Sequence, residues 1–350
     1  MRKGMALALT LLAVGPAVLA GPRLVVDPEV YDFGTVAEGL MVEAVFTLTN
    51  AGDAPLEFSR QPATSCGCTS APLPKSVLAP GESMELVAYF DSTNFGGRQI
   101  RKYVYVYTND PTGERRTLAI VGYVRDAAPY ESSASTLHAG FYILIDLRTP
   151  EEYARGHLLG AINIPFPALT SWLDRLPKRL TIYFYDATGQ QAAQATQMLR
   201  DQGFYAVQAV AGGLLGWWYA MGDAFIVWAE GVEPIPPPGE PYYGGNTVKP
   251  QELANSYQVI LDLRAPEAFA AGHFPGAVNL SLQEVPDWAQ ALPSSGTGRL
   301  YIWVVDEDGT VACQAAQWLR GSGYPHARCV IGGLHQWEIR YGELALWPEG

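Results

Sequence analysis

An internal repeat constrains this chain of 350 residues more than any other feature of its sequence. The stretch from Leu144 to Pro165 matches the stretch from Leu261 to Leu280 at most of its polar positions. The pairs that lie 116 positions apart are Asp146 and Asp262, Arg148 and Arg264, Gly156 and Gly272, His157 and His273, and Asn163 and Asn279. The pairs that lie 120 positions apart are Asp186 and Asp306, Gly189 and Gly309, Gly212 and Gly332, and Trp217 and Trp337. The repeat predicts two copies of one domain, with a four-residue insertion between the two sets of pairs.

Within each copy, apolar runs of strand length alternate with helical stretches. This alternation predicts α/β domains with a parallel central sheet, over residues 137–230 and 247–350. Between them, residues 231–246 contain the run Ile235-Pro236-Pro237-Pro238, which predicts a stiff, extended spacer.

Four motifs recur in both copies: D-x-R, E-x-(F/Y)-x-x-G-H, G-A-x-N and a closing G-G-x-x-x-W. Together they resemble the rhodanese family over the whole of each copy. The resemblance implies an α/β fold, often in tandem with only one active copy. It also implies the transfer of a sulfane sulfur from a donor such as thiosulfate, through a cysteine persulfide.

The active loop of that family reads C-x-x-G-x-R, and its cysteine lies over backbone N–H groups that stabilise a thiolate. Here the cysteine position is aspartate in both copies, Asp186 and Asp306. The other loop positions are Gly189 and Gln191 in the first copy and Gly309 and Val311 in the second. A carboxylate accepts hydrogen bonds from such N–H groups but cannot carry a sulfane sulfur.

We therefore expect no catalytic residue in either loop. The backbone N–H groups of each loop form a set of donors that we call its cradle, and we interpret the two aspartates as built-in anions that fill the two cradles. A cation site or a general base is the less favoured alternative, since a lone acid without paired ligands is usually structural. The run Asp306-Glu307-Asp308 is the more suggestive place for a hard cation, although a solvated acidic turn is favoured there. Whether the chain binds a metal stays open, and we expect no cofactor.

Two further polar pairs in the repeat are interpreted as structural. His157 and His273 occupy a G-H-x-x-G-A turn in both copies, which favours a hydrogen-bonded structural role over catalysis. The arginines are expected to form ion pairs, Arg148 with Glu151, and Arg264 with Glu267 or Asp262.

Residues 24–125 alternate with a period of two and carry frequent turn signals, which predicts about seven short strands in a β-sandwich. Phe33-Gly34, the stretch Asn50–Phe58, the S-C-G-C-T run at Ser65–Thr69 and the stretch Leu78–Ser83 resemble a bacterial Ig-like domain of unknown function related to hydin-type modules. That resemblance implies an envelope location and no established reaction. A polar stretch at residues 126–136 is predicted to be a linker.

The four cysteines are Cys66, Cys68, Cys313 and Cys329. For Cys66 and Cys68 a disulfide or another redox-labile pair is favoured, and a Cu(I) site or a thiol-exchange pair remain alternatives. Cys313 begins a helix and Cys329 ends a strand, at the same edge of a parallel sheet, so a disulfide between them is sterically plausible. The alternative is that Cys313 acts as a displaced nucleophile at a helix N-terminus.

Residues 1–20 carry a basic start, an apolar stretch and a small-residue end, which predicts a cleaved signal peptide and a periplasmic or secreted protein that does not insert into the membrane after cleavage. A net charge of −12 disfavours nucleic acid as a partner. The sequence thus predicts a noncatalytic binding or scaffold module with a protein partner. A sulfurtransferase or thiol-redox protein and a copper carrier are the alternatives.

Overall fold

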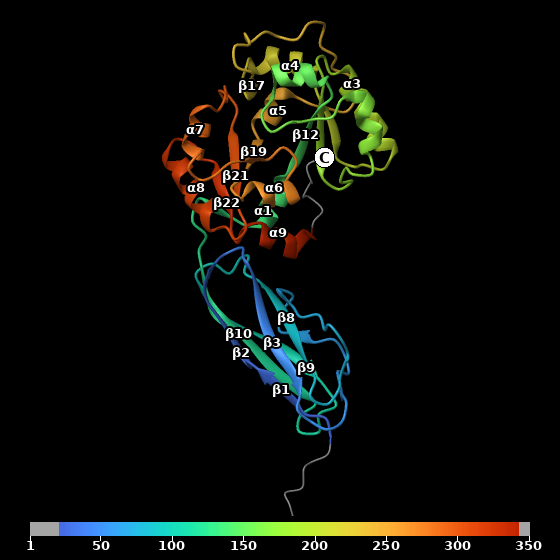
Figure 1. The fold of residues 1–350 in the computed structure, drawn as a ribbon, viewed down its shortest axis with the longest axis vertical. Coiled ribbons are helices and arrows are strands. Elements are labelled where there is room, and N and C mark those ends of the chain that lie inside the picture. The colour runs from blue at the N-terminus through green and yellow to red at the C-terminus, as the bar shows by residue number, and fades with distance from the viewer. Residues whose placement is uncertain (1–20, 343–350) are drawn as a thin grey trace, which may run out of the picture. The chain divides into compact units, whose positions relative to one another are not determined.

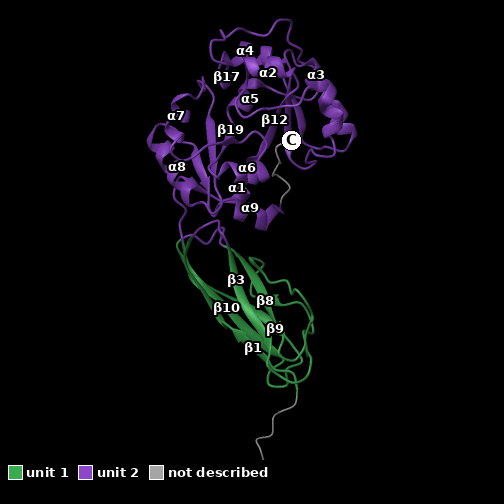
Figure 2. Ribbon diagram, in the orientation of Figure 1, with its two compact units in different colours: residues 1–36, 42–91, 97–124 green, residues 37–41, 92–96, 125–350 purple. Residues whose placement is uncertain are grey.

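The computed structural model describes residues 21–342, so the predicted signal peptide at residues 1–20 lies outside the described residues (Figure 1). The chain forms two compact units (Figure 2). The first unit contains residues 42–91 and 97–124 with the strands before residue 37, and the second contains residues 37–41, 92–96 and everything described from residue 125 onward. Among the residues that are described, no helix has the length and apolar character needed to cross a membrane.

The first unit is an antiparallel β-sandwich, as the alternating pattern predicts. Its strands are β1 (Leu24–Asp27), β2 (Val30–Ala37), β3 (Met41–Asn50), β4 (Leu56–Glu57), β5 (Ala63–Thr64), β6 (Thr69–Ser70), β7 (Val77–Leu78), β8 (Ser83–Asp91), β9 (Arg98–Tyr107) and β10 (Arg115–Arg125). One sheet has the order β1-β3-β8-β6, the other β2-β10-β9-β5, and β4 pairs with β7. In β3 the alternate side chains of Ala44, Phe46 and Leu48 are fully buried, because a strand turns every second residue toward the core.

The second unit contains two five-stranded parallel sheets, which confirms the predicted α/β architecture. The strands of the first sheet are, in order across it, β14 (Ile162–Asn163), β12 (Tyr142–Asp146), β15 (Thr181–Tyr185), β16 (Val207–Val210) and β18 (Thr247–Val248). Those of the second are β20 (Val278–Asn279), β19 (Tyr257–Asp262), β21 (Leu300–Val305), β22 (Ala327–Val330) and β11 (Glu131–Ser132). A small antiparallel pair joins β13 (Gly156–Leu158) to β17 (Ile226–Trp228).

Helices connect these strands. They are α1 (Ala134–Gly140), α2 (Pro150–Arg155), the 3₁₀ helix η1 (Phe166–Trp172), α3 (Gln190–Asp201), α4 (Gly213–Met221), α5 (Pro250–Ala254), α6 (Pro266–Ala271), α7 (Val285–Gln290), α8 (Thr310–Gly321) and α9 (Gly333–Tyr341). The two longest, α3 and α8, follow the loops that contain Asp186 and Asp306, so each begins directly after a candidate loop.

The two copies exchange their first strands. The strand β18 precedes the second copy in sequence but lies in the first sheet, where Val210 aligns with Val248. The strand β11 precedes the first copy but lies in the second sheet, where Ser132 aligns with Val330. Each sheet is therefore complete only when both copies are present.

The predicted linker at residues 126–136 is corrected by this exchange. Residues 131–132 form β11, and α1 begins at Ala134. The reason is physical: a two-residue strand with polar side chains carries no periodic signal, and only its pairing with β22 makes it a strand.

The copies also share their cores. One buried cluster contains Trp217 of the first copy together with Ala312 and Leu319 of the second, and the other contains Leu199 of the first copy together with Trp337 of the second. Both tryptophans are at most 1% exposed. The two copies thus form one body with two hydrophobic cores, and each core contains residues from both copies.

Candidate functional site

The two candidate loops occupy equivalent places. One joins β15 to α3, and the other joins β21 to α8, so both lie at the carboxyl edge of a parallel sheet, where open α/β folds place their ligands. Each loop delivers its aspartate to the first turn of a 12-residue helix, whose backbone N–H groups have no partner within the helix.

Asp186 fills the first cradle. Its Oδ1 accepts hydrogen bonds from the backbone N–H groups of Thr188, at 2.7 Å, and of Gly189. Its Oδ2 accepts the N–H of Ala192 at 2.9 Å. The side chain is 4% exposed, so the negative charge stays within the loop, where the positive end of the helix dipole favours it.

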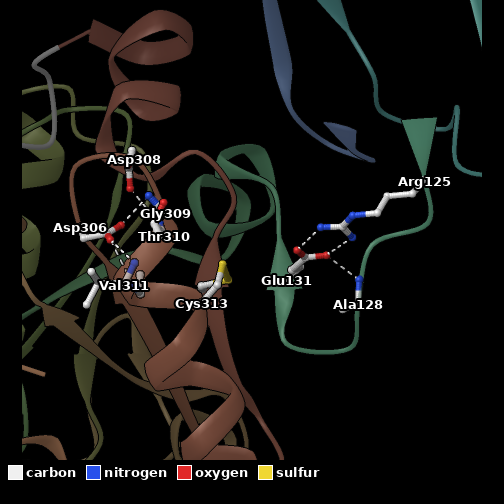
Figure 3. The surroundings of a disulfide bond; sticks show 11 residues. Arg125, Ala128, Glu131, Asp306, Asp308, Gly309, Thr310, Val311 and Cys313 are labelled. Carbon is white, nitrogen blue, oxygen red and sulfur yellow. Dashed lines mark hydrogen bonds and ion pairs between the residues drawn. A yellow bond between two sulfur atoms is a disulfide. The ribbon is translucent and has the colours of Figure 1, made fainter. Parts of the chain in front are cut away.

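Asp306 fills the second cradle in nearly the same way (Figure 3). Its Oδ1 accepts the N–H of Gly309 at 2.5 Å, and its Oδ2 accepts the N–H groups of Val311 at 2.8 Å and Ala312 at 3.1 Å. Burial raises the pKa of Asp306 above the ordinary value of 3.8, and the three N–H donors oppose that rise. In both copies the carboxylate thus accepts backbone N–H groups of the loop and of the first helical turn.

Two glycines make this turn sterically feasible. Gly189 and Gly309 adopt φ of 92° and 84°, a region that only glycine enters readily. A Cβ on Gly189 would lie 2.8 Å from the nitrogen of Gly213, and a Cβ on Gly309 would lie 2.6 Å from the nitrogen of Gly332. Both glycines are therefore required by the close approach of the two loops that form each carboxyl edge.

The position that holds arginine in the family's loop supplies no cation in either copy. The side chain of Gln191 is exposed, and Val311 contributes only its backbone N–H to the cradle. A cavity of about 410 Å³ beside the first loop is lined by Arg148, Asp186 and Gln191, among others. Arg148 does not provide a free charge there, because its guanidinium is already paired.

That pairing corrects one expectation. The guanidinium of Arg148 contacts Asp146, with Nη2 2.6 Å from Oδ2, and not Glu151. Arg264 pairs with Asp262 at 2.8 Å, as one of the two predicted alternatives has it. In the first copy Nη2 of Arg148 also donates to the carbonyl of Gly156 at 2.7 Å, so the D-x-R motif ties the strand end to the G-H turn.

The cysteines form two disulfides in the structure. Cys313, in the first turn of α8, is bonded to Cys329 in β22, with their Cα atoms 4.8 Å apart. Cys66 is bonded to Cys68 with Cα atoms 5.2 Å apart, in the turn that leads from β5 in one sheet to β6 in the other. Within residues 21–342 no cysteine is free, so neither pair offers a thiolate in this state.

The described residues contain no group of three or more His, Cys, Asp or Glu side chains placed to hold a metal ion. In the acidic run of the second loop, Asp308 Oδ1 accepts the N–H of Thr310 at 2.9 Å while Asp306 faces the cradle. The two carboxylates therefore accept hydrogen bonds from backbone N–H groups of the turn.

The sequence did not indicate that the proline-rich spacer rests on the first loop. The backbone N–H of Tyr242 donates to the carbonyl of Thr188 at 2.8 Å, and its carbonyl accepts the N–H of Gly212 at 2.9 Å. Ile235 and the three prolines of the spacer line a cavity of about 180 Å³, together with Arg148 and Ala187 among others. No local sequence pattern predicts this contact, because a segment without regular secondary structure has no periodicity.

The fold and the loops define a tandem α/β protein of rhodanese type in which an aspartate stands in both cysteine positions. A family model described as a rhodanese-like domain matches residues 131–220 and 249–340, and one described as a protein of unknown function, DUF1573, matches residues 24–124. The chain belongs to the rhodanese-like family, with a DUF1573 domain before its two rhodanese-like domains.

Its relatives include proteins named for sulfur transfer. A "Sulfurtransferase" of Allochromatium vinosum is 31% identical over 75 residues, which are 21% of this chain and 70% of the relative. The thiosulfate sulfurtransferase PspE of Escherichia coli is 39% identical over 72 residues, 20% of this chain and 68% of the relative. A solved thiosulfate sulfurtransferase from Pseudomonas aeruginosa is 21% identical with a TM-score of 0.24, and the match covers 62% of this chain and 42% of that one.

Proposed function

We propose that this protein is an exported, noncatalytic rhodanese-like module of the cell envelope that binds another protein. The observation that carries the proposal is the pair of filled cradles. In each loop the donors that would hold a persulfide sulfur already bond to a carboxylate of the chain itself.

Sulfur transfer through these loops lacks its reacting atom. A carboxylate oxygen does not form a persulfide, so a sulfane sulfur has no place to reside between donor and acceptor. A buried negative charge in the cradle also opposes the approach of an anionic donor such as thiosulfate.

The cysteines do not restore that chemistry. Cys313 lies in the first turn of α8, near the second loop, but its sulfur is bonded to Cys329, which is fully buried. A disulfide sulfur is no nucleophile, so Cys313 would have to be reduced before it could attack a donor. Two disulfides in one chain also support an oxidising compartment, which agrees with the proposed export.

Several exposed aromatic side chains favour a protein partner. Tyr205, Tyr219 and Tyr243 are 83%, 65% and 59% exposed. Tyrosine is enriched at protein interfaces because its ring buries apolar area while its hydroxyl still bonds. The acidic net charge of −12 favours a neutral or basic surface on that partner.

The decisive experiment supplies the missing atom. Mature protein incubated with thiosulfate and cyanide is expected to form no thiocyanate above the buffer rate. An Asp186→Cys, Gln191→Arg double variant restores the C-x-x-G-x-R loop and is the matched positive control, expected to form a cyanide-labile persulfide. Turnover by the wild type that disappears in Cys313→Ser would overturn the proposal in favour of a sulfurtransferase.

A second experiment addresses the partner. The full mature chain, used as bait in envelope extract, is expected to retain the same protein as the restored double variant, because binding does not need the loop chemistry. If the Asp186→Cys, Gln191→Arg variant retained the partner and the wild type did not, a noncatalytic role would be contradicted.

A further inference from the structure

A cleft of about 580 Å³ lies between the two rhodanese-like copies, away from both candidate loops. Its walls include equivalent residues from the two repeats: His157 with His273, and Gly160 with Gly276. Apolar and aromatic side chains form much of the remainder, including Trp288 and Leu292. Volumes of about 300–1,000 Å³ and walls of this composition are typical of small-molecule sites at domain interfaces.

The cleft lies at the local symmetry axis of the repeat. Gly160 and Gly276 are equivalent residues and touch each other: a Cβ on Gly276 would lie 2.0 Å from the carbonyl oxygen of Gly160. Equivalent residues contact each other only near an axis that relates the copies. Each histidine precedes its glycine by three residues, and both histidines line this cleft.

The tautomer of both imidazoles follows from their partners. Nδ1 of His157 lies 3.0 Å from the carbonyl oxygen of Tyr153, and Nδ1 of His273 lies 2.9 Å from that of Phe269. A carbonyl oxygen only accepts, so Nδ1 carries the hydrogen in each ring. In a neutral imidazole with this arrangement, Nε2 is the atom with the free lone pair.

Both rings are held in place. His157 stacks on Tyr153 with ring centroids 3.9 Å apart and an interplanar angle of 14°, and His273 stacks on Phe269 at 3.8 Å and 12°. Burial lowers the pKa of His157 below the ordinary value of 6.5, so this ring is neutral at pH 7. A neutral, oriented imidazole presents a hydrogen-bond acceptor and not a positive charge.

We infer that this cleft is a binding site for a small, uncharged and largely apolar molecule that donates O–H or N–H hydrogen bonds to Nε2 of His157 and His273. No lysine or arginine is among the described residues that line the cleft, which disfavours an anionic ligand such as thiosulfate. The inference goes beyond the proposed function and does not depend on the two aspartate loops.

Resorcinol is a suitable probe, because it combines an aromatic ring with two O–H donors and is uncharged at pH 7. The matched control is 1,3-dimethoxybenzene, which keeps the ring and lacks the donors. Titration of the mature chain, followed by ligand-observed NMR and calorimetry, is expected to give one saturable site. Resorcinol should bind about tenfold more tightly than the dimethoxy compound.

Variants locate the site. His157→Phe and His273→Phe keep the stacked ring and remove the acceptor, and each is expected to weaken resorcinol binding about fivefold, as the loss of one hydrogen bond implies. Trp318→Phe, at an exposed position that does not line the cleft, should leave affinity unchanged. Equal affinity for the two probes, or unchanged affinity in both histidine variants, would overturn the inference.

A readout on the wild type guards against variants that do not fold. In protein labelled with ¹⁵N-histidine, the Nε2 resonances of His157 and His273 are expected to shift on addition of resorcinol and to stay in place with 1,3-dimethoxybenzene. Absence of any shift at saturating resorcinol would equally refute the proposed contact.

Discussion

The phenol of Tyr257, in the second rhodanese-like copy, donates a hydrogen bond to the carbonyl oxygen of Leu159, in the first copy, at 2.7 Å. Tyr257 is fully buried, and its ring stacks on that of Phe225 with centroids 4.2 Å apart. A buried tyrosine from one copy thus satisfies a backbone group of the other, within a core that both copies build.

Tyr257→Phe tests this contact. The substitution keeps the ring and leaves the buried carbonyl of Leu159 without its donor, so we expect the free energy of unfolding to fall by about 1–3 kcal/mol. Denaturant unfolding of the mature chain measures the loss. Tyr205→Phe removes an exposed hydroxyl and should change stability by less than about 0.5 kcal/mol, and an equal loss in both variants would contradict the assignment.

The exchanged strands predict that the copies do not fold separately. A fragment of residues 126–246 lacks β18 and leaves the edge of β16 open, whereas a fragment of residues 126–350 keeps both exchanged strands. We expect a single cooperative transition from the longer fragment, and weak cooperativity or aggregation from the shorter one. A cooperative, soluble 126–246 fragment would argue against the exchange.

Asp306→Ala tests the filled cradle. Removal of the carboxylate leaves three backbone N–H groups without their acceptor, so we expect a loss of at least about 2 kcal/mol in the free energy of unfolding. Glu307→Ala is the matched control, because Glu307 is adjacent, acidic and exposed, and it should change stability by about 0.5 kcal/mol or less. Similar losses in the two variants would mean that the carboxylate is not the acceptor that organises the loop.

His157 predicts a pH dependence. Its pKa is lowered in the folded state, chiefly by burial, while the unfolded chain keeps the ordinary value of 6.5. The unfolded state therefore binds more protons below pH 6.5, and the free energy of unfolding decreases as the pH falls through that value. Unfolding at a series of pH values should show this contribution in the wild type and not in His157→Phe. A steeper acid loss in the variant would reverse the sign and refute the lowered pKa.

Much of the fold was predictable because its signals are local. The alternation in Ala44, Phe46 and Leu48 reports a strand with one buried face, and the structure buries all three. The positions of Asp186 and Asp306 were predictable for the same reason, since their place between a strand and a helix N-terminus follows from the order of the elements along the chain. The pairing of Arg148 with Asp146 in place of Glu151 was not predictable, because it depends on the direction of the side chains at a strand end.

The sequence by itself determined the duplication, the domain types and the identity of the atom at each cradle, since these depend on residue type and on periodicity along the chain. Tertiary structure alone decided that β11 and β18 change places, that Tyr242 rests on the first loop, and that His157 and His273 face one cleft. These relationships join residues that are far apart in the chain, and their energies arise only when packing brings the two copies together.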